Sequence, residues 1–229
     1  MSKNKLQKFA EMAGFSNVFQ NFNFKKPQLI GANHQKVEMA DQWGGKHFGN
    51  EQPITLELAC GRGEYTVALA ERYPKRNFIG VDIKGARIHK GAKYALENDL
   101  TNTAFLRTRI ELIDQFFAKD EIDEIWITFP DPFLRESKAN RRLSHPYFIE
   151  KYRKFLKKGG LIHLKTDSLP LYEFTLEIVP DVPGLHILEQ CSDIYGSEQL
   201  AKDLDIKTYY ENMHLNRDLK ITYIRLQLD

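Results

Sequence analysis

From Ile54 onward, short apolar runs alternate with longer segments whose apolar residues recur at helical spacing. Strands are expected over residues 54–59, 77–82, 103–108, 123–129 and 161–166, with closing strands over 186–194 and 221–228. Helices are expected over residues 64–73, 86–99, 110–117, 144–160 and 169–179. Strands that alternate with helices pair in parallel, so the sequence predicts an α/β fold with a doubly wound, mostly parallel sheet.

The fourth expected helix ends at Gly159-Gly160, because glycine suits the left-handed position that follows a helix. The chain of 229 residues is long enough for a single core. Residues 1–50 differ in kind, being rich in Asn, Lys and Phe, and are interpreted as an arm or a loosely packed extension. One domain is therefore expected over residues 51–229.

Several classes of protein are disfavoured by the composition. No apolar run approaches the roughly 18 residues of a membrane span, and the first residues lack the pattern of a signal peptide. The two cysteines, Cys60 and Cys191, form no CxxC pair, and the seven histidines show no metal-ligand spacing. We therefore expect a cytoplasmic protein without a metal site, a disulfide framework or a membrane segment.

Charge is distributed unevenly along the chain. Residues 135–158 contain nine Lys or Arg and two acids, whereas residues 167–205 contain nine acids and one lysine. Ordinary solvated charge accounts for most such runs. This basic block, however, directly follows the turn Pro130-Asp131-Pro132, a candidate site. Cations placed beside a site favour a polyanionic partner such as nucleic acid.

The first strand ends in a glycine loop, Glu57-Leu58-Ala59-Cys60-Gly61-Arg62-Gly63. A dinucleotide fingerprint would require a third glycine at position 66, and Thr66 there argues against NAD and a dehydrogenase. Asp82 ends the second strand, where a carboxylate can accept hydrogen bonds from ribose hydroxyls. Two acids without a phosphate-binding lysine suit S-adenosylmethionine, a cationic cofactor without phosphates. Read alone, Glu57 could equally be a capping carboxylate and Asp82 a turn residue.

The fourth strand runs into Pro130-Asp131-Pro132. Proline fixes its own φ and restricts the residue before it, so Asp131 has few backbone options. A rigid turn of this kind favours the positioning of a carboxylate at a reactive centre. The alternative is a strand-exit turn with a solvated aspartate.

The segment FPDPFLRESKANRRL, residues 129–143, resembles the FPDPW-K-x-x-x-x-K/N-R-R signature of the bacterial tRNA (guanine-N7-)-methyltransferases. The resemblance extends to the glycine loop, to LKTD at 164–167 and to the late T-x-x-E of Thr208 to Glu211, and so covers residues 54–228. It implies a Rossmann-like class I S-adenosylmethionine-dependent methyltransferase that forms 7-methylguanosine in the variable loop of tRNA and releases S-adenosylhomocysteine.

The resemblance also implies roles for the matched residues. The catalytic residue would be Asp131, and the cofactor-binding residues would be Glu57, Gly61, Gly63, Asp82 and Arg109. The substrate-binding residues would be Arg135, Asp167, Thr208, Glu211, Arg141 and Arg142.

Four positions depart from the family pattern. Ala59 replaces the first glycine of the E/D-x-G-x-G-x-G methyltransferase loop that ELACGRG resembles. Arg135 replaces a lysine, and Phe133 replaces a tryptophan while keeping an aromatic ring. Arg109 stands where the family commonly has Asp or Asn, and a cation cannot accept a hydrogen bond from the adenine amine. Two alternatives remain open: a methyltransferase acting on another RNA base, an exocyclic amine or a small molecule, and a non-catalytic RNA-binding subunit. The expected partner is tRNA, bound by a monomer or a homodimer.

Overall fold

The computed structural model describes residues 3–197, 202–209, 211 and 220–229 of the chain. Its strands form a single sheet in the order β3-β2-β1-β6-β5-β4-β7-β8-β10-β9. The central strands are β4 (Ile54–Leu58), β5 (Asn77–Asp82), β6 (Thr103–Arg107), β7 (Ile122–Thr128) and β8 (Leu156–Thr166), which pair in parallel. The predicted fold class, a mostly parallel α/β sheet, is confirmed.

The two expected closing strands are also present. β10 (Thr222–Leu228) lies antiparallel between β8 and β9 (Leu185–Cys191) at one end of the sheet. The strand order reverses between β4 and β7, because β5 and β6 lie on one side of β4 and β7 and β8 on the other. A reversal of this kind opens a crevice at the carboxyl ends of the strands, where ligands of doubly wound sheets bind.

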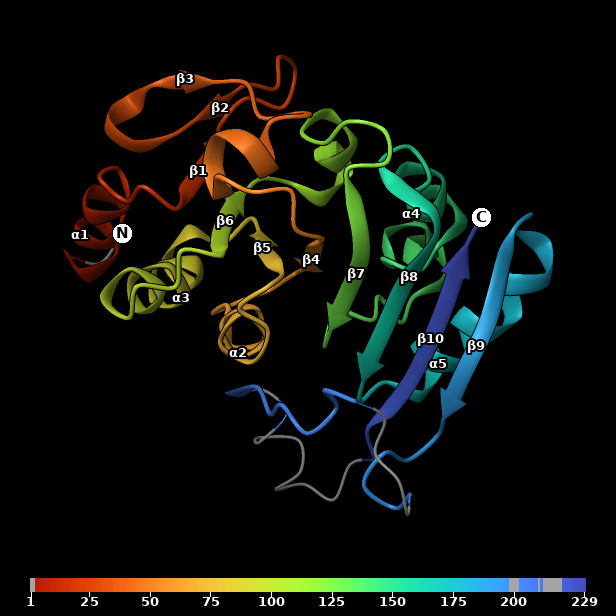
Figure 1. Ribbon diagram of the computed structural model, residues 1–229. Coiled ribbons are helices and arrows are strands. Elements are labelled where there is room, and N and C mark those ends of the chain that lie inside the picture. The colour runs from red at the N-terminus through yellow and green to blue at the C-terminus, as the bar shows by residue number, and fades with distance from the viewer. Residues whose placement is uncertain (1–2, 198–201, 210, 212–219) are drawn as a thin grey trace.

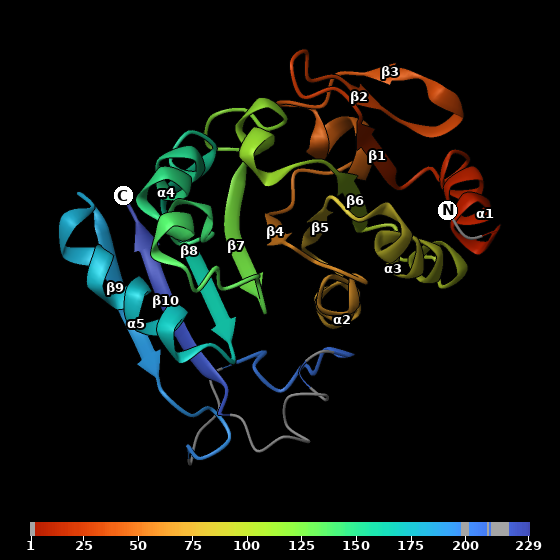
Figure 2. The same ribbon diagram turned by 180° about the vertical axis from the view of Figure 1, so that it is seen from behind.

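Helices cover both faces of the sheet (Figures 1 and 2). One group consists of α1 (Lys3–Met12), α2 (Glu64–Arg72) and α3 (Gly85–Glu97), and α2 and α3 contact β5 and β6. On the other face, α4 (Pro146–Tyr152) and α5 (Leu169–Ile178) lie in front of β8 and β10 in Figure 2. Shorter helical turns are η1 (Ala32–His34), η2 (Trp43–Phe48), η3 (Ile110–Gln115), η4 (Glu136–Arg141) and η5 (Val179–Asp181).

The central strands are apolar on both faces because both faces are covered. Leu56, Ile79, Ile125 and Ile127 are fully buried. Near-continuous Val, Ile and Leu runs are typical of parallel strands sandwiched between helices. This burial accounts for the apolar runs that predicted the strands.

The N-terminal segment is packed more tightly than its composition indicates. β1 (Val18–Asn21) pairs in parallel with β6, and β2 (Leu29–Ile30) and β3 (Lys36–Val37) continue the sheet beyond it. Trp43 is fully buried, and its indole N–H donates to the carbonyl of Phe116 at 2.9 Å. The expectation of loose packing is therefore wrong, because a few apolar side chains anchor an otherwise polar segment. The boundary at residue 50 stays a prediction.

Two expected helices differ in the structure. The helix expected over 144–160 ends at Tyr152, and β8 begins at Leu156. Gly159, with φ of +74°, lies inside β8 where its pairing with β7 shifts, so glycine here serves a bulge and not a helix end. The helix expected over 110–117 is the 3₁₀ turn η3.

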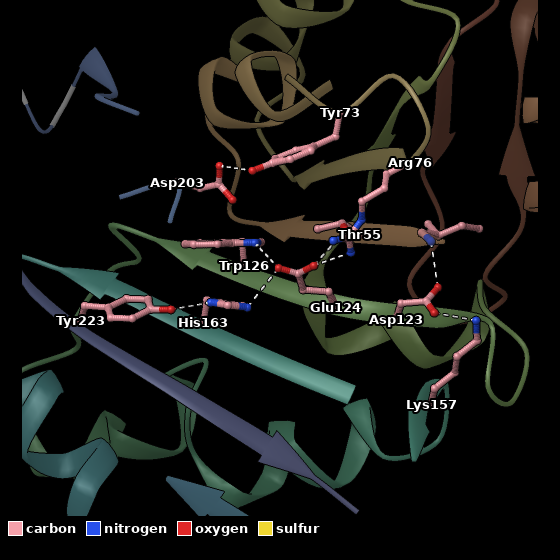
Figure 3. Close-up of polar contacts among 11 residues, drawn as sticks. Thr55, Tyr73, Arg76, Asp123, Glu124, Trp126, Lys157, His163, Asp203 and Tyr223 are labelled. Atoms are coloured by element: carbon pink, nitrogen blue, oxygen red, sulfur yellow. Dashed lines mark hydrogen bonds and ion pairs between the residues drawn. The ribbon is translucent and has the colours of Figure 1, made fainter. Parts of the chain in front are cut away.

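Side chains of β7, β8 and β10 form a polar cluster inside the protein (Figure 3). Its members are Glu124, Trp126, His163 and Tyr223. Glu124 accepts a hydrogen bond from the Trp126 indole at 2.8 Å and lies 3.0 Å from Nε2 of His163. The His163 ring stacks on Trp126 with centroids 4.0 Å apart, and its Nδ1 lies 2.7 Å from the Tyr223 hydroxyl. Burial alone would raise the pKa of Glu124, but His163 and Arg76 lower it to about 2. None of these side chains lines the cavities of the candidate site described below. We therefore assign the cluster a structural role, in which it links β7, β8 and β10.

Candidate active site

A cavity of about 340 Å³ opens at the carboxyl ends of the parallel strands. Ala59 follows β4, Asp82 ends β5, Thr108 and Arg109 follow β6, and Asp131 follows β7. A smaller cavity of about 50 Å³ adjoins it beside the glycine loop, sharing Ala59, Arg87 and Phe129. Seven of the twelve predicted site residues line these two cavities at the reversal of strand order: Glu57, Gly61, Asp82, Arg109, Asp131, Arg141 and Thr208.

A larger hollow of about 670 Å³ lies near the amino ends of β4 and β7. Its lining is dominated by charged and amide side chains such as Asp41, Lys46, Asp123 and Lys157. Ligands of doubly wound sheets bind at the opposite edge, where the glycine loop lies. We therefore place the candidate site in the two smaller cavities at the carboxyl ends of the strands.

The glycine loop owes its shape to left-handed backbone at three positions. Gly61 and Gly63 have φ of +56° and +70°. A Cβ on Gly63 would collide with the ring of Phe105, so only glycine allows α2 to begin this close to the sheet. Ala59 has φ of +61°, the conformation that the glycine usual at this motif position would adopt without strain.

Glu57 is buried at the end of β4 and joins three elements. Its carboxylate accepts hydrogen bonds from the backbone N–H of Thr66 at 2.8 Å and from the Thr66 hydroxyl, both on α2. It also accepts from the hydroxyl of Thr128 on β7 at 2.7 Å. Burial raises the pKa of Glu57 to about 7, although these hydrogen bonds oppose the shift. Glu57 also lines the cavity of about 50 Å³. It therefore both holds the glycine loop in shape and borders the cavity beside that loop.

Asp82 holds the other side of the same loop. Its Oδ2 accepts from the backbone N–H of Gly61 at 3.0 Å, and its Oδ1 accepts from that of Lys84 at 2.7 Å. The side chain of Asp82 is buried, yet it lines the cavity of about 340 Å³. These bonds hold the carboxyl group of Asp82 in place at the mouth of the β5 loop.

Asp131 projects from a turn whose two phenylalanines adopt left-handed backbone. Phe129 has φ of +48° and Phe133 has φ of +41°. Residues held in this sparsely populated region cluster at functional sites. The Asp131 carboxylate accepts a hydrogen bond from the N–H of Phe133 at 3.3 Å and remains exposed at the cavity.

Arg142 holds this turn from behind. The side chain is buried, and its guanidinium donates to the carbonyls of Pro132 at 3.3 Å and Phe133 at 3.2 Å. It also lies 4.3 Å over the ring of Phe174 on α5. The guanidinium thus ties the turn after β7 to the helical layer.

The other predicted cations lie at the surface. Arg141 lines the cavity, and its guanidinium lies 4.6 Å over the ring of Phe133. Arg109 also lines the cavity, and its guanidinium lies 5.1 Å over Phe24. Arg135 is exposed and precedes η4, outside the cavity lining.

The late motif is divided between the site and the protein interior. Thr208 lines the smaller cavity beside the glycine loop. Glu211 is fully buried and pairs with Lys165, whose Nζ lies 2.7 Å from Oε1. Its carboxylate also accepts from the Tyr195 hydroxyl at 2.6 Å and from the backbone N–H of Thr208 at 3.3 Å. Asp167 is half-buried just beyond β8.

Sequence reasoning overlooked Lys165, Thr66 as an acid partner and Thr128. Burial lowers the pKa of Lys165, and its ammonium donates to the carbonyls of Leu204 and Ile206 as well as to Glu211, each at 2.9 Å. A lysine inside an apolar strand was the available signal, because lysine is almost never fully buried unless paired. The threonines carried no such signal, since their spacing to Glu57 follows only from the fold.

Comparison with known proteins decides the family. A family model described as "Putative methyltransferase" matches residues 51–224. The tRNA (guanine-N(7)-)-methyltransferase of Bacteroides thetaiotaomicron is 46% identical over 100% of this chain and 87% of its own. That of Porphyromonas gingivalis is 50% identical over 95% of this chain and 86% of its own. The chain belongs to the tRNA (guanine-N(7)-)-methyltransferase family.

For this tRNA (guanine-N(7)-)-methyltransferase family member, a solved structure supports the fold alone. The 16S rRNA methyltransferase KamB superposes with a TM-score of 0.64 at 13% identity, over 85% of this chain and 96% of that one. Within the described residues, no three His, Cys, Asp or Glu side chains are grouped so as to hold a metal ion. Nor does any helix in those ranges have the length and apolar character needed to cross a bilayer.

Proposed function

We propose that this protein transfers a methyl group from S-adenosylmethionine to N7 of a guanosine in the variable loop of tRNA. The observation that carries the proposal is the convergence of Glu57, Asp82 and Asp131 on adjoining cavities beside exposed cations. A cationic donor and an acidic base-recognition group would thus meet at one end of the sheet. The relatives' shared activity supports the same reaction.

The residues at the glycine loop suit S-adenosylmethionine. The larger cavity, about 340 Å³, falls within the range of roughly 300–1,000 Å³ typical of small-ligand sites. Asp82 would hold the ribose, Gly61 and Gly63 would let the ligand approach the backbone, and Glu57 would face its cationic amino-acid end. When bound, this cofactor supplies an electrophilic methyl group on a sulfonium.

Arg109 lies beside the adenine end of this arrangement. It cannot accept from the adenine amine, but it lines the cavity, and its planar guanidinium offers a flat face on which an adenine ring stacks. We propose that this face replaces the hydrogen bond that other family members make at the same position.

The chemistry at guanine requires positioning more than a base. N7 carries an in-plane lone pair and needs no deprotonation before attack. Methylation leaves the ring positively charged, so a nearby carboxylate stabilises the product-like state. Asp131 would accept from the N1–H and N2–H edge of guanine and offset that charge, with Asp167 and Thr208 assisting in substrate binding. Most of the rate enhancement would come from holding N7, the methyl carbon and the sulfur in line.

The exposed cations would bind the RNA backbone. Arg135, Lys138 and Arg141 are exposed on the segment after β7, next to Asp131. Arg142 and Glu211 contribute to substrate binding by holding the turn and the late motif in place, since both side chains are buried. A target base must leave its stack to reach the cavity, which suits a loop nucleotide. A cytoplasmic location follows from this substrate.

Incubation of the purified protein with an unmodified tRNA transcript and methyl-labelled S-adenosylmethionine tests the proposal. Nuclease digestion should release labelled 7-methylguanosine, and fragment mapping should place it in the variable loop. Asp131→Ala should lower kcat by at least 100-fold while leaving cofactor affinity unchanged, because Asp131 would contact the base. Label in another base would contradict the proposed reaction. An Asp131→Ala rate within a few-fold of that of the unaltered protein would contradict the role of Asp131.

A further inference from the structure

Two phenylalanine rings are exposed on the loop that follows β1. Phe22 is 63% exposed and Phe24 is 55% exposed. β1 pairs in parallel with β6, so its carboxyl end lies at the same edge of the sheet as the cavity. Large apolar side chains grouped at the rim of a site mark a surface that binds something.

Each ring is partnered by a guanidinium from the end of β6. Arg107 lies 5.3 Å from the centre of the Phe22 ring, and Arg109 lies 5.1 Å from that of Phe24. A hollow of about 190 Å³ lies between this loop and the end of β6. It shares Ile83 and Arg109 with the cavity of about 340 Å³ in the candidate active site. The aromatic surface therefore continues directly from the candidate active site.

Asparagine side chains fix the shape of this loop. Oδ1 of Asn23 accepts from the backbone N–H of Lys25 at 2.9 Å and of Lys26 at 3.0 Å. Oδ1 of Asn21 accepts from the N–H of Asn23 and of Gln28, both at 3.2 Å. A loop closed by its own side chains presents its rings with little further loss of conformational entropy on binding.

The charge of this region is one-sided. Residues 12–37 contain no Asp or Glu, and Lys25 and Lys26 are exposed beside the two rings. Arg107 and Arg109 add two cations from the end of β6, and no acid among the described residues lines the hollow of about 190 Å³ between them and the loop. The acids nearby, Asp82, Glu111 and Asp131, line the neighbouring cavity of about 340 Å³. Aromatic rings set among cations are the surface on which unpaired bases stack while their phosphates are neutralised.

We infer that residues 22–26 with Arg107 and Arg109, the β1 rim, form a second RNA-binding surface that stacks unpaired bases of the substrate. This inference rests on the proposed function. In the sheet order, the ends of β5 and β4 lie between the β1 rim and the basic segment after β7. An RNA laid over the cavity would therefore be held on both sides, by stacking at the β1 rim and by phosphate contacts at the other.

Substitutions of the two rings test the inference by tRNA affinity. Phe22→Leu and Phe24→Leu keep apolar bulk but remove the aromatic face, whereas Phe22→Tyr and Phe24→Tyr keep it. Stacking of one base is worth about 1–3 kcal/mol, so each Leu variant should bind unmodified tRNA on the order of tenfold more weakly. The Tyr variants should bind as the unaltered protein does. Leu6→Ala, which removes an exposed apolar side chain on α1, is the matched control and should change nothing.

Two further measurements separate this inference from its alternatives. S-adenosylmethionine affinity and the thermal midpoint should be the same in the Leu variants and the unaltered protein. Loss of cofactor affinity would assign the rings to the cofactor site and overturn the inference, as would tRNA affinity indifferent to all four substitutions. Failure of the unaltered protein to methylate tRNA would instead refute the proposed function, and ring-dependent RNA affinity would still support the β1 rim.

Discussion

Lys165 and Glu211 form an ion pair with no exposed side-chain surface, although 46 residues separate them in the sequence. The ammonium of Lys165 uses its three donors on Glu211 and on the carbonyls of Leu204 and Ile206. One strand-end lysine therefore fastens the segment that carries Thr208 to the end of β8. The position of Thr208 beside the glycine loop depends on this pair.

Removal of one partner of the pair should be strongly destabilising. Lys165→Met leaves a buried carboxylate without its cation, and losses of about 3–5 kcal/mol are typical of a broken buried pair. The double variant Lys165→Met/Glu211→Leu should recover part of that loss, because no charge stays unpaired. Urea unfolding measures both values, with the half-exposed pair Arg153–Glu150 as a control expected to contribute less than about 1 kcal/mol. Additive losses in the double variant would show that the two residues act independently.

The raised pKa of Glu57 predicts a stability that falls as pH rises. A carboxyl group with a pKa of about 7 in the folded protein and 4.5 in the unfolded chain holds its proton more strongly when folded. Its contribution is complete below about pH 4.5 and is lost as pH rises through 7, a change of about 3 kcal/mol. Glu57→Gln should therefore flatten the stability profile of the cofactor-free protein between pH 4.5 and 7. An unchanged slope in this variant would assign the dependence to other groups.

The same group predicts how the affinity for S-adenosylmethionine depends on pH. A cationic ligand favours the ionised carboxylate, so affinity should rise between pH 6 and 8 as Glu57 loses its proton. Titration calorimetry at several pH values measures this dependence. In Glu57→Gln the affinity should be weaker and nearly independent of pH, whereas a retained pH dependence would exclude Glu57 as its source.

Backbone strain at the glycine loop gives a stabilising substitution. Ala59 has φ of +61°, and left-handed backbone costs an L-residue about 1–2 kcal/mol. Ala59→Gly should relieve this strain, partly offset by the greater flexibility of glycine when unfolded, for a net gain of about 0.5 kcal/mol. Gly63→Ala is the opposite case, because its φ is also positive and its Cβ would meet Phe105. Thermal unfolding of both variants should therefore show shifts of opposite sign.

The parallel core and its site were accessible from the sequence because both follow from local patterns. Apolar runs marked β4, β5 and β7 within a residue or two, and the motifs at their ends fixed where Asp82 and Asp131 lie. Glycine chemistry was misleading at Gly159, since the same left-handed conformation serves a helix end and a strand bulge. Only the pairing of β8 with β7 distinguishes the two.

Long-range contacts were not accessible from the sequence. The packing of Trp43 against the loop of Phe116 and the addition of β1 to β6 depend on partners more than 70 residues away. Arg142 looked like its neighbour Arg141 because both belong to one basic run, yet one side chain is buried and the other exposed. Sequence patterns report residue types, whereas the direction of a side chain is set by the turn that carries it.

The carboxylate of Glu124 should control stability in acid. Burial raises its pKa, but His163 and Arg76 prevail and lower it to about 2. The contribution is therefore complete above about pH 4.5 and is lost as pH falls through 2, a change of about 3 kcal/mol. Glu124→Gln should reduce the loss of stability between pH 4.5 and 2 by about 3 kcal/mol. Acid unfolding followed by circular dichroism measures it, and an unaltered acid midpoint would contradict the assignment.

The adjacent arginines Arg141 and Arg142 should differ in kind when each is replaced. Arg141 is exposed at the cavity, so Arg141→Ala should raise the KM for tRNA and reduce the salt dependence of binding by about one phosphate contact. Arg142 is buried and donates to the Pro132 and Phe133 carbonyls, so Arg142→Lys should lose one of these bonds and loosen the turn of Asp131. The expected result for Arg142→Lys is a kcat lower by about tenfold with an unchanged salt slope, since displaced catalytic groups lose rate before affinity. Methyl-transfer kinetics at two salt concentrations distinguish the two effects, and equal changes in both variants would show that Arg142 contacts RNA directly.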